Sequence, residues 1–147
     1  MTNEFLFTHA ELFLDKKLNI VTNLANMSAI IMQNISDLNW VGFYLYDGEK
    51  LYLGPFQGKA AVTIIDMGKG VCGTSASKRE ILIVDDVHKF PGHIPCDCDS
   101  NSEIVLPIVK NGELFGVLDI DSPIQNRFDE NTAKDLEKLV KLLVDIL

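Results

Sequence analysis

The chain has 147 residues, a formal net charge of -8 at neutral pH and 47% hydrophobic residues. This length fits a single domain over residues 1–147 with its own core, and the high aliphatic content argues against disorder. The acidic balance disfavours nucleic acid and anionic membrane surfaces as partners, and no apolar run approaches the roughly 20 residues of a membrane span. Three cysteines without an export signal predict a reducing, cytoplasmic location.

The N-terminal part of the chain, from about Phe7 to Asp37, is predicted to be helical, with a separate short helix around Leu12 and Phe13. Apolar side chains recur there at helical spacing, namely Ile20, Leu24, Met27, Ile31 and Ile35. We interpret this stretch as an amphipathic helix that faces either the core or a dimer partner.

Trp40 to Tyr46 is rich in aromatic and β-branched residues, which favours a strand. Asp47 and Gly48 form a turn into the next strand, Leu51–Leu53. Alternation places Trp40, Gly42, Tyr44 and Tyr46 on one face of the first strand. This aromatic face is either the wall of a pocket or a second core layer, and the sequence leaves both interpretations open.

A loop over residues 54–58 precedes a third predicted strand over residues 60–65. The glycine-rich segment 68–74 then leads into a short helix over residues 74–78. Its glycine spacing fits neither the Walker pattern nor the dinucleotide fingerprint. Cys72 is the better lead, because a cysteine near a helix N-terminus is favoured as thiolate by the helix dipole.

The second half of the chain continues with a strand over residues 81–84 and a long loop over residues 85–95. Two cysteines, Cys96 and Cys98, follow this loop. A hairpin centred on Asn111-Gly112 comes next, and an amphipathic helix runs from about Asp129 to Leu147. Six strands between helices, without βαβ alternation, predict an α+β domain: a central antiparallel sheet with the N- and C-terminal helices packed on one side.

Three carboxylates belong to the predicted hairpin. Asp119 and Asp121 alternate along its second strand and therefore share a face. A two-residue turn would place Glu103 on the opposite face, because a one-residue change of register moves every side chain across the sheet. A three-residue loop with Gly112 at the bulge position, or a bulge at Pro107, would bring all three carboxylates together. We predict one of these arrangements, or a Glu103 that lies outside the regular strand.

Three kinds of site are compatible with these residues. A zinc site could draw on Cys72, Cys96 and Cys98 with His93 or His88, but the spacing matches no common zinc pattern. A regulatory ligand-binding module would use the aromatic face and leave the cysteines without a role. A thiol redox enzyme would use the cysteines as nucleophile and resolving thiol, with carboxyl groups as acid and binding groups.

Several blocks, in this order, resemble one known family. They are Asn-Trp-Val-Gly-Phe-Tyr at 39–44, Gly-Pro-Phe-Gln-Gly at 54–58, Gly-Lys-Gly-Val-Cys-Gly-Thr at 68–74, Asp-Val-His at 86–88, Phe-Pro-Gly-His-Ile at 90–94, Ser-Glu-Ile-Val-Leu-Pro at 102–107 and Gly-Val-Leu-Asp-Ile-Asp at 116–121. Together they resemble the free methionine-(R)-sulfoxide reductases, a family of GAF-domain enzymes. The resemblance covers essentially the whole chain. It implies a GAF fold, thioredoxin-dependent reduction of the free amino-acid sulfoxide, and a homodimer. No metal or organic cofactor is expected.

Carried over by position, the resemblance assigns roles to seven residues. Cys96 falls at the catalytic cysteine and Cys72 at a second cysteine of the family. The remaining assignments are Trp40 and Tyr44 as pocket aromatics, and Glu103, Asp119 and Asp121 as substrate-binding and acid groups.

Three positions depart from the family pattern. Val62 stands where these enzymes usually carry a third cysteine that recycles the catalytic one. Pro95 replaces the usual alanine before Cys96, and Cys98 is an additional thiol. Either Cys72 resolves the intermediate, or a reductant attacks it directly, or turnover has been lost and the domain is a non-catalytic small-molecule-binding module.

The chemistry implied by the resemblance needs an acid as well as a nucleophile. The Cys96 thiolate would attack the sulfoxide sulfur and become a sulfenic acid, which a second thiol converts to a disulfide. A carboxyl group must supply a proton to the sulfoxide oxygen, and crowding of carboxylates in a dry pocket raises the pKa of such a group. The sequence does not choose between Glu103 and Asp121 for this role.

Overall fold

The computed structural model describes residues 4–92 and 99–147. Its strands are β1 (Trp40–Tyr46), β2 (Lys50–Gln57), β3 (Ile64–Asp66), β4 (Leu82–Val84), β5 (Ser102–Lys110) and β6 (Glu113–Ser122). Its helices are α1 (Glu4–Phe13), α2 (Ile20–Asn34), α3 (Gly70–Lys78) and α4 (Glu130–Ile146), with a 3-10 turn η1 (Val87–Lys89).

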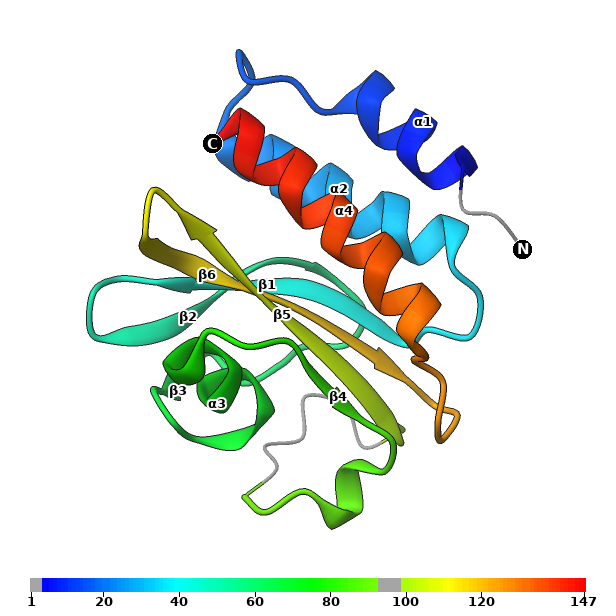
Figure 1. Cartoon of the computed structure of the whole chain (residues 1–147), viewed down its shortest axis with the longest axis vertical. Coiled ribbons are helices and arrows are strands. Elements are labelled where there is room, and N and C mark those ends of the chain that lie inside the picture. The colour runs from blue at the N-terminus through cyan, green and yellow to red at the C-terminus, as the bar shows by residue number, and fades with distance from the viewer. Residues whose placement is uncertain (1–3, 93–98) are drawn as a thin grey trace.

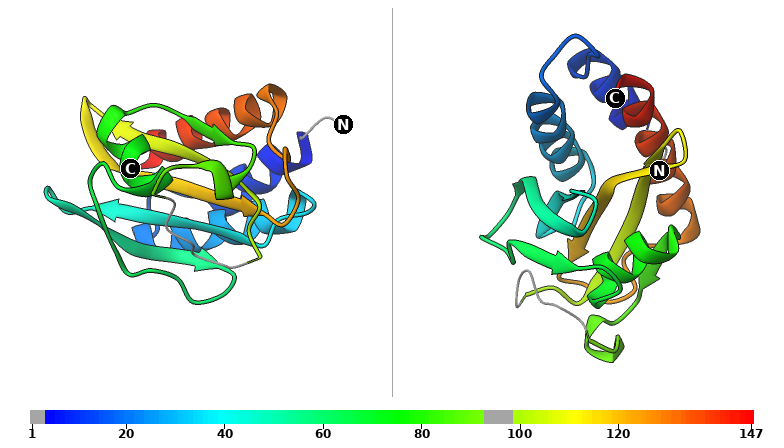
Figure 2. Two further views of the ribbon diagram at one scale, coloured as in Figure 1. Left: turned by 90° about the horizontal axis from the view of Figure 1, so that it is seen from below. Right: turned by 90° about the vertical axis from the view of Figure 1, so that its left-hand side faces the viewer.

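The strands form one sheet in the order β3-β2-β1-β6-β5-β4, and every pairing in it is antiparallel. Helices α1, α2 and α4 lie on one side of this sheet, and α3 lies on the other side (Figures 1 and 2). The predicted α+β class, the six strands and the position of the terminal helices are therefore confirmed. No described helix combines the length and apolar character needed to cross a membrane.

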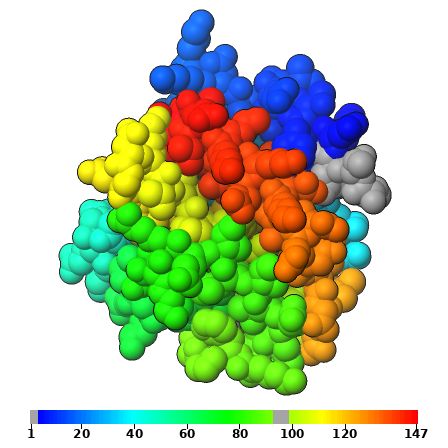
Figure 3. Space-filling model, in the orientation of Figure 1, coloured from blue at the N-terminus to red at the C-terminus, as the bar shows by residue number. Residues whose placement is uncertain are grey.

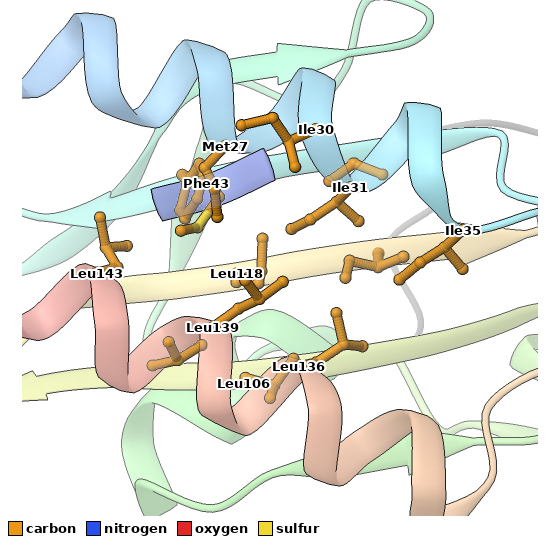
Figure 4. Packing of buried hydrophobic residues seen from close by; sticks show 14 of the residues in the cluster. Met27, Ile30, Ile31, Ile35, Phe43, Leu106, Leu118, Leu136, Leu139 and Leu143 are labelled. Atoms are coloured by element: carbon orange, nitrogen blue, oxygen red, sulfur yellow. The ribbon is translucent and has the colours of Figure 1, made fainter. Parts of the chain in front are cut away.

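The main core fills the space between the sheet and the two long helices (Figure 4). Helix α4 begins after Asp129, whose side chain accepts a hydrogen bond from the Thr132 amide at 2.8 Å, as helix caps commonly do. It buries Leu136, Leu139, Val140 and Leu143. Helix α2 contributes Leu24, Met27, Ile30 and Ile31, and the facing strands contribute Phe43, Leu106 and Leu118. This layer holds β1, β5 and β6 in place.

Several predicted boundaries are wrong. Residues 54–57 belong to β2 and not to a loop. A bulge in β2, where Gly54 and Pro55 lie opposite the single residue between Gly42 and Tyr44 of β1, accommodates Pro55, which lacks an amide donor. The third strand is shorter than predicted, at Ile64–Asp66. Helix α3 begins at Gly70, four residues before the predicted start, so that Cys72 lies in its first turn.

Candidate active site

Strand pairing places an aromatic residue and two carboxyl groups in one row across the sheet. Trp40 of β1 pairs with Asp121 of β6, and Asp121 pairs with Glu103 of β5. Directly paired residues of an antiparallel sheet project to the same face. Asp119 lies two residues before Asp121 and shares this face. All four side chains are at most 4% exposed, so the row is buried on the side of the sheet that α3 covers.

A bulge in β6 brings the carboxyl groups together. The turn at Asn111 and Gly112 keeps two residues, with Lys110 paired to Glu113, but Val109 pairs with Leu114 and Ile108 with Gly116. The extra residue, Phe115, shifts the register by one. Without it, Glu103 would oppose Ile120 and point into the main core. The three carboxyl groups do share a face, but none of the predicted arrangements occurs: the turn keeps two residues, Pro107 pairs regularly with Val117, Glu103 lies within β5, and the bulge is in β6.

Cys72 of α3 lies beside two of these carboxyl groups, Glu103 and Asp119. Its Sγ and carboxylate oxygens of Glu103 and Asp119 all lie within 4.8 Å of one another, and its side chain is buried. Three elements therefore meet here: α3 supplies the thiol, β5 supplies Glu103 and β6 supplies Asp119. A thiol and carboxyl groups at this separation, shielded from water, can exchange protons with a bound substrate and with one another.

Burial dominates the electrostatics of Glu103. Removal from water raises the pKa of Glu103 well above its ordinary value of 4.5, and the negative charge of Asp121 raises it further. A hydrogen bond with Asp119 acts in the opposite direction. The raised pKa favours the protonated form of Glu103, and a protonated carboxyl group in a buried site can act as a general acid.

The aromatic face forms a second apolar layer around this row. The Trp40 ring stacks on Phe56 at a centroid distance of 5.2 Å and on Tyr44 at 6.0 Å. Its Nε1 donates to the Lys59 carbonyl at 3.0 Å, and the Tyr44 hydroxyl donates to the Val62 carbonyl at 2.8 Å. Both aromatics are therefore fixed by stacking and by hydrogen bonds to the segment between β2 and β3. Their contact with substrate stays a prediction.

Gly42 makes room for the Trp40 ring. A Cβ at this position would lie 2.3 Å from Phe56 Cβ and 2.6 Å from Trp40 Cη2. We expect Gly42→Ala to displace the indole and to lower the free energy of unfolding by about 1–3 kcal/mol, as overpacking does. Because Trp40 is the only tryptophan, its emission reports the displacement directly. An unchanged urea midpoint together with an unchanged emission spectrum would contradict this prediction.

A hydrogen-bonded chain that sequence reasoning missed leads to Asp121. Asn39 Nδ2 donates to Ser100 Oγ at 3.0 Å, and Ser100 Oγ donates to Asp121 Oδ2 at 3.0 Å. Nearby, the exposed Lys59 and Asp99 form an ion pair at 2.8 Å. Nothing in the local sequence separates Ser100 from Ser102; only the register of β5 and β6 shows which serine reaches the carboxylate.

One donor set in the described part of the chain has the composition of a metal site. It consists of Cys72, Glu103 and Asp119, whose thiolate and carboxylate groups are ligands that divalent cations accept. The histidine of the zinc hypothesis that is described, His88, lies apart from this set. It is exposed, and its Nε2 lies 3.1 Å from Asn101 Oδ1. Cys96, Cys98, His93 and Pro95 lie outside the described residues.

Comparison with known proteins shows the family to which the sequence is similar. Residues 13–145 match the family described as GAF domain. The free methionine-R-sulfoxide reductase of Escherichia coli (strain K12) is 46% identical over 129 residues, which cover 88% of this chain and 78% of that protein. The enzyme of the same name from Saccharomyces cerevisiae is 48% identical over 137 residues, with coverages of 88% and 76%.

Solved structures give the same result at the level of the backbone. The structure of fRMsr of Staphylococcus aureus in complex with substrate is 46% identical and superimposes with a TM-score of 0.93, covering 99% of this chain and 95% of that one. A free methionine-R-sulfoxide reductase from Neisseria meningitidis, also in complex with its substrate, is 41% identical with a TM-score of 0.91 and coverages of 97% and 86%.

Proposed function

Because this chain belongs to the GAF-domain family of free methionine-R-sulfoxide reductases, we propose that it reduces free L-methionine (R)-sulfoxide to L-methionine with a cysteine nucleophile. The observation that carries this proposal is the buried row of Glu103, Asp119 and Asp121 beside the Cys72 thiol. A row of acidic groups suits a substrate with an ammonium group, and a protonated carboxyl group suits a substrate whose oxygen must accept a proton.

Substrate recognition follows from charge and shape. Asp119 and Asp121 offer negative charge and acceptor oxygens to the ammonium of the free amino acid. Backbone amides of the glycine-rich segment before Cys72 offer donors to its carboxylate. Trp40 and Tyr44 provide the apolar wall against which the S-methyl group packs. A peptide-bound methionine sulfoxide lacks the free ammonium, so the site selects the free amino acid.

Reduction begins with attack of the Cys96 thiolate on the sulfoxide sulfur. This attack forms a bond between Cys96 Sγ and the methionine sulfur, while Glu103 donates its proton to the sulfoxide oxygen. The S–O bond then breaks and the oxygen leaves as hydroxide. The hydroxide attacks Cys96 Sγ and breaks the sulfur–sulfur bond, which releases methionine and leaves a sulfenic acid on Cys96. The sulfoxide gains two electrons and the cysteine loses two. This assigns the acid role to Glu103, because Asp121 accepts a hydrogen bond from Ser100 and its charge raises the Glu103 pKa.

Recycling then needs a second thiol. The Cys72 thiol condenses with the Cys96 sulfenic acid, which forms a disulfide and releases water. Thioredoxin in the cytoplasm reduces this disulfide and returns both cysteines to thiols. Cys72 takes this role because Val62 occupies the position at which the family resemblance predicts the usual recycling cysteine. The proximity of the Cys72 thiol to Glu103 and Asp119 supports this route, because Glu103 is the proposed proton donor to the substrate that Cys96 attacks.

The proposed assembly is a homodimer. Helix α1 and the first turn of α2 expose apolar side chains, namely Phe5 at 68%, Leu12 at 76%, Phe13 at 50%, Ile20 at 37% and Val21 at 58%. The N-terminal part of the described chain lies at one end of the molecule, which is blue in Figure 3. Exposed large apolar side chains on neighbouring helices are typical of an interaction surface. Sedimentation of the purified protein tests this assignment, and a monomer at micromolar concentration would contradict it.

Stereoselective turnover tests the proposed activity. We expect thioredoxin-dependent reduction of free methionine-R-sulfoxide to exceed that of the S epimer by at least about 100-fold, and Cys96→Ser to abolish it. Chiral chromatography of the remaining sulfoxide measures both rates. Equal rates for the two epimers, or no turnover with Cys96 intact, would overturn the proposal. Quenching of Trp40 fluorescence by the sulfoxide without turnover would indicate the binding-module alternative instead.

A further inference from the structure

The backbone of Lys59 lies beside the Trp40 end of the carboxyl row. The Lys59 carbonyl accepts a hydrogen bond from Trp40 Nε1 at 3.0 Å, and a Cβ at the preceding Gly58 would lie 2.6 Å from Trp40 Cδ1. Trp40 in turn pairs directly with Asp121 across the sheet. The Lys59 side chain therefore starts next to the indole that neighbours Asp121.

The ammonium of Lys59 is held near the same end of the row by Asp99. Lys59 Nζ donates to Asp99 Oδ2 at 2.8 Å. Asp99 directly precedes Ser100, whose Oγ donates to Asp121 Oδ2 at 3.0 Å. One backbone contact and one side-chain contact thus place Lys59 at the edge of the buried row, while 65% of its side chain remains exposed. Lys59 is a solvent-accessible cation beside an acidic site.

A free amino acid needs positive charge at its site as well as acidic groups. In methionine sulfoxide the ammonium and the carboxylate are bonded to the same carbon, so acidic groups that attract the ammonium repel the carboxylate. The backbone amides of the glycine-rich segment contribute dipoles but no net charge. A site with acidic groups alone would therefore favour a substrate whose carboxylate is neutralised, such as its carboxamide.

We propose that Lys59 is a specificity-determining residue that binds the α-carboxylate of the substrate, and that it exchanges Asp99 for this carboxylate when the free amino acid binds. The exchange costs little, because an exposed ion pair contributes little to stability and the lysine stem is flexible. Asp99 is then a competitor of the substrate carboxylate. This inference rests on the proposed function and deepens it, since it names the group that selects a free carboxylate.

Binding of methionine-R-sulfoxide and of its carboxamide tests the proposal. The two ligands share the ammonium, the sulfoxide and the methyl group, and they differ in the charge of the carboxylate. Calorimetry in a Cys96→Ser background gives both Kd values without turnover, at about pH 6, where the α-amino groups are protonated. We expect Lys59→Met to raise the Kd of the free acid about tenfold and that of the carboxamide less than about twofold. Lys59→Arg keeps the charge and should retain the preference for the acid.

Asp99→Asn separates this role from a purely structural one. If the ion pair only held the local structure, Asp99→Asn and Lys59→Met would weaken the binding of both ligands alike. We instead expect Asp99→Asn to lower the Kd of the free acid by about two- to fivefold, because it removes the competitor for Lys59, and to leave that of the carboxamide unchanged. Lys50→Met is the matched control, since Lys50 forms another exposed ion pair, with Asp66 at 3.2 Å. It should leave both Kd values within about twofold of the wild type.

With Cys96 intact, the loss in Lys59→Met should appear in KM rather than in kcat. Equal effects of Lys59→Met on the two ligands, or no effect on either, would overturn the proposal, and Lys59→Gln carries the same measurement if Lys59→Met does not fold. A wild-type protein that binds the acid but does not reduce it would instead overturn the proposed reductase activity, and the two Kd values would still decide the role of Lys59. Absence of binding of either ligand would overturn both.

Discussion

Glu103→Gln should lower kcat for methionine-R-sulfoxide by about 100-fold to 10,000-fold, the range that general acid catalysis supplies, and should stabilise the protein at neutral pH. Glutamine has the shape of a protonated glutamic acid and can still donate to Asp119 and Asp121. It cannot deliver a proton to the sulfoxide oxygen. The substrate-binding groups remain, so we expect KM to change much less than kcat.

The effect on stability has a defined sign. Burial and the charge of Asp121 raise the pKa of Glu103 above 4.5, so the folded state holds a proton that the unfolded state has released. Between the two pKa values the free energy of unfolding therefore falls as pH rises, by about 1.4 kcal/mol per pH unit. Glu103→Gln removes this loss. The free energy of unfolding of Glu103→Gln should equal that of the wild type below about pH 4.5. The difference in favour of the variant should grow as pH rises toward the pKa of Glu103 in the folded state, and it should be constant above that pKa.

Urea denaturation at a series of pH values, alongside kcat, separates this prediction from a general loss of structure. Glu113→Gln is the matched control, because Glu113 is an exposed glutamate at the turn of the same hairpin. It should change neither the pH dependence of stability nor kcat. A Glu103→Gln protein that is less stable than the wild type at neutral pH, or fully active, would contradict the assignment of Glu103 as a buried acid.

The sequence alone does not determine which face of the sheet carries Glu103, because the answer depends on the pairing register of the two hairpin strands. The Asn111-Gly112 turn was identifiable, and alternation gave the shared face of Asp119 and Asp121. The position of the bulge depends on long-range packing: Gly116 lies so close to β1 that a Cβ there would be 2.2 Å from the Tyr44 carbonyl oxygen. Local sequence carries no information about that contact, so it suggests a three-residue loop or a bulge at Pro107, whereas the bulge occurs at Phe115.

Two other differences have the same origin. Pro55 indicated a loop, yet β2 continues through it because a bulge relative to β1 tolerates the missing donor. Helix α3 was expected to begin at Thr74, since glycine disfavours helices. It begins at Gly70, and Gly73 lies against the Asp66 carbonyl, 2.4 Å from where a Cβ would be. A larger residue at position 73 could not make this approach of α3 to the end of β3.

Cys72→Ser should separate the first turnover from the later ones. Oxygen transfer to Cys96 does not use Cys72, so we expect a burst of about one methionine per subunit at close to the wild-type rate. The following steady state with thioredoxin should fall at least about 100-fold, because the sulfenic acid lacks its condensing thiol. Rapid-quench measurement of methionine gives both phases, and mass spectrometry without reductant should show a Cys72–Cys96 linkage only in the wild type.

Two further variants show which thiol resolves Cys96. Cys98→Ser is the control, and it should retain the wild-type steady-state rate. Val62→Cys in the Cys72→Ser background places a thiol where the family resemblance predicts a recycling cysteine. The carbonyl of Val62 accepts a hydrogen bond from the Tyr44 hydroxyl. This variant should restore part of the steady-state rate. If Cys72→Ser turns over at the wild-type rate and Cys98→Ser does not, Cys98 is the resolving thiol. If neither change slows turnover, thioredoxin attacks the Cys96 sulfenic acid directly, and the position of Cys72 beside Glu103 and Asp119 has no part in recycling.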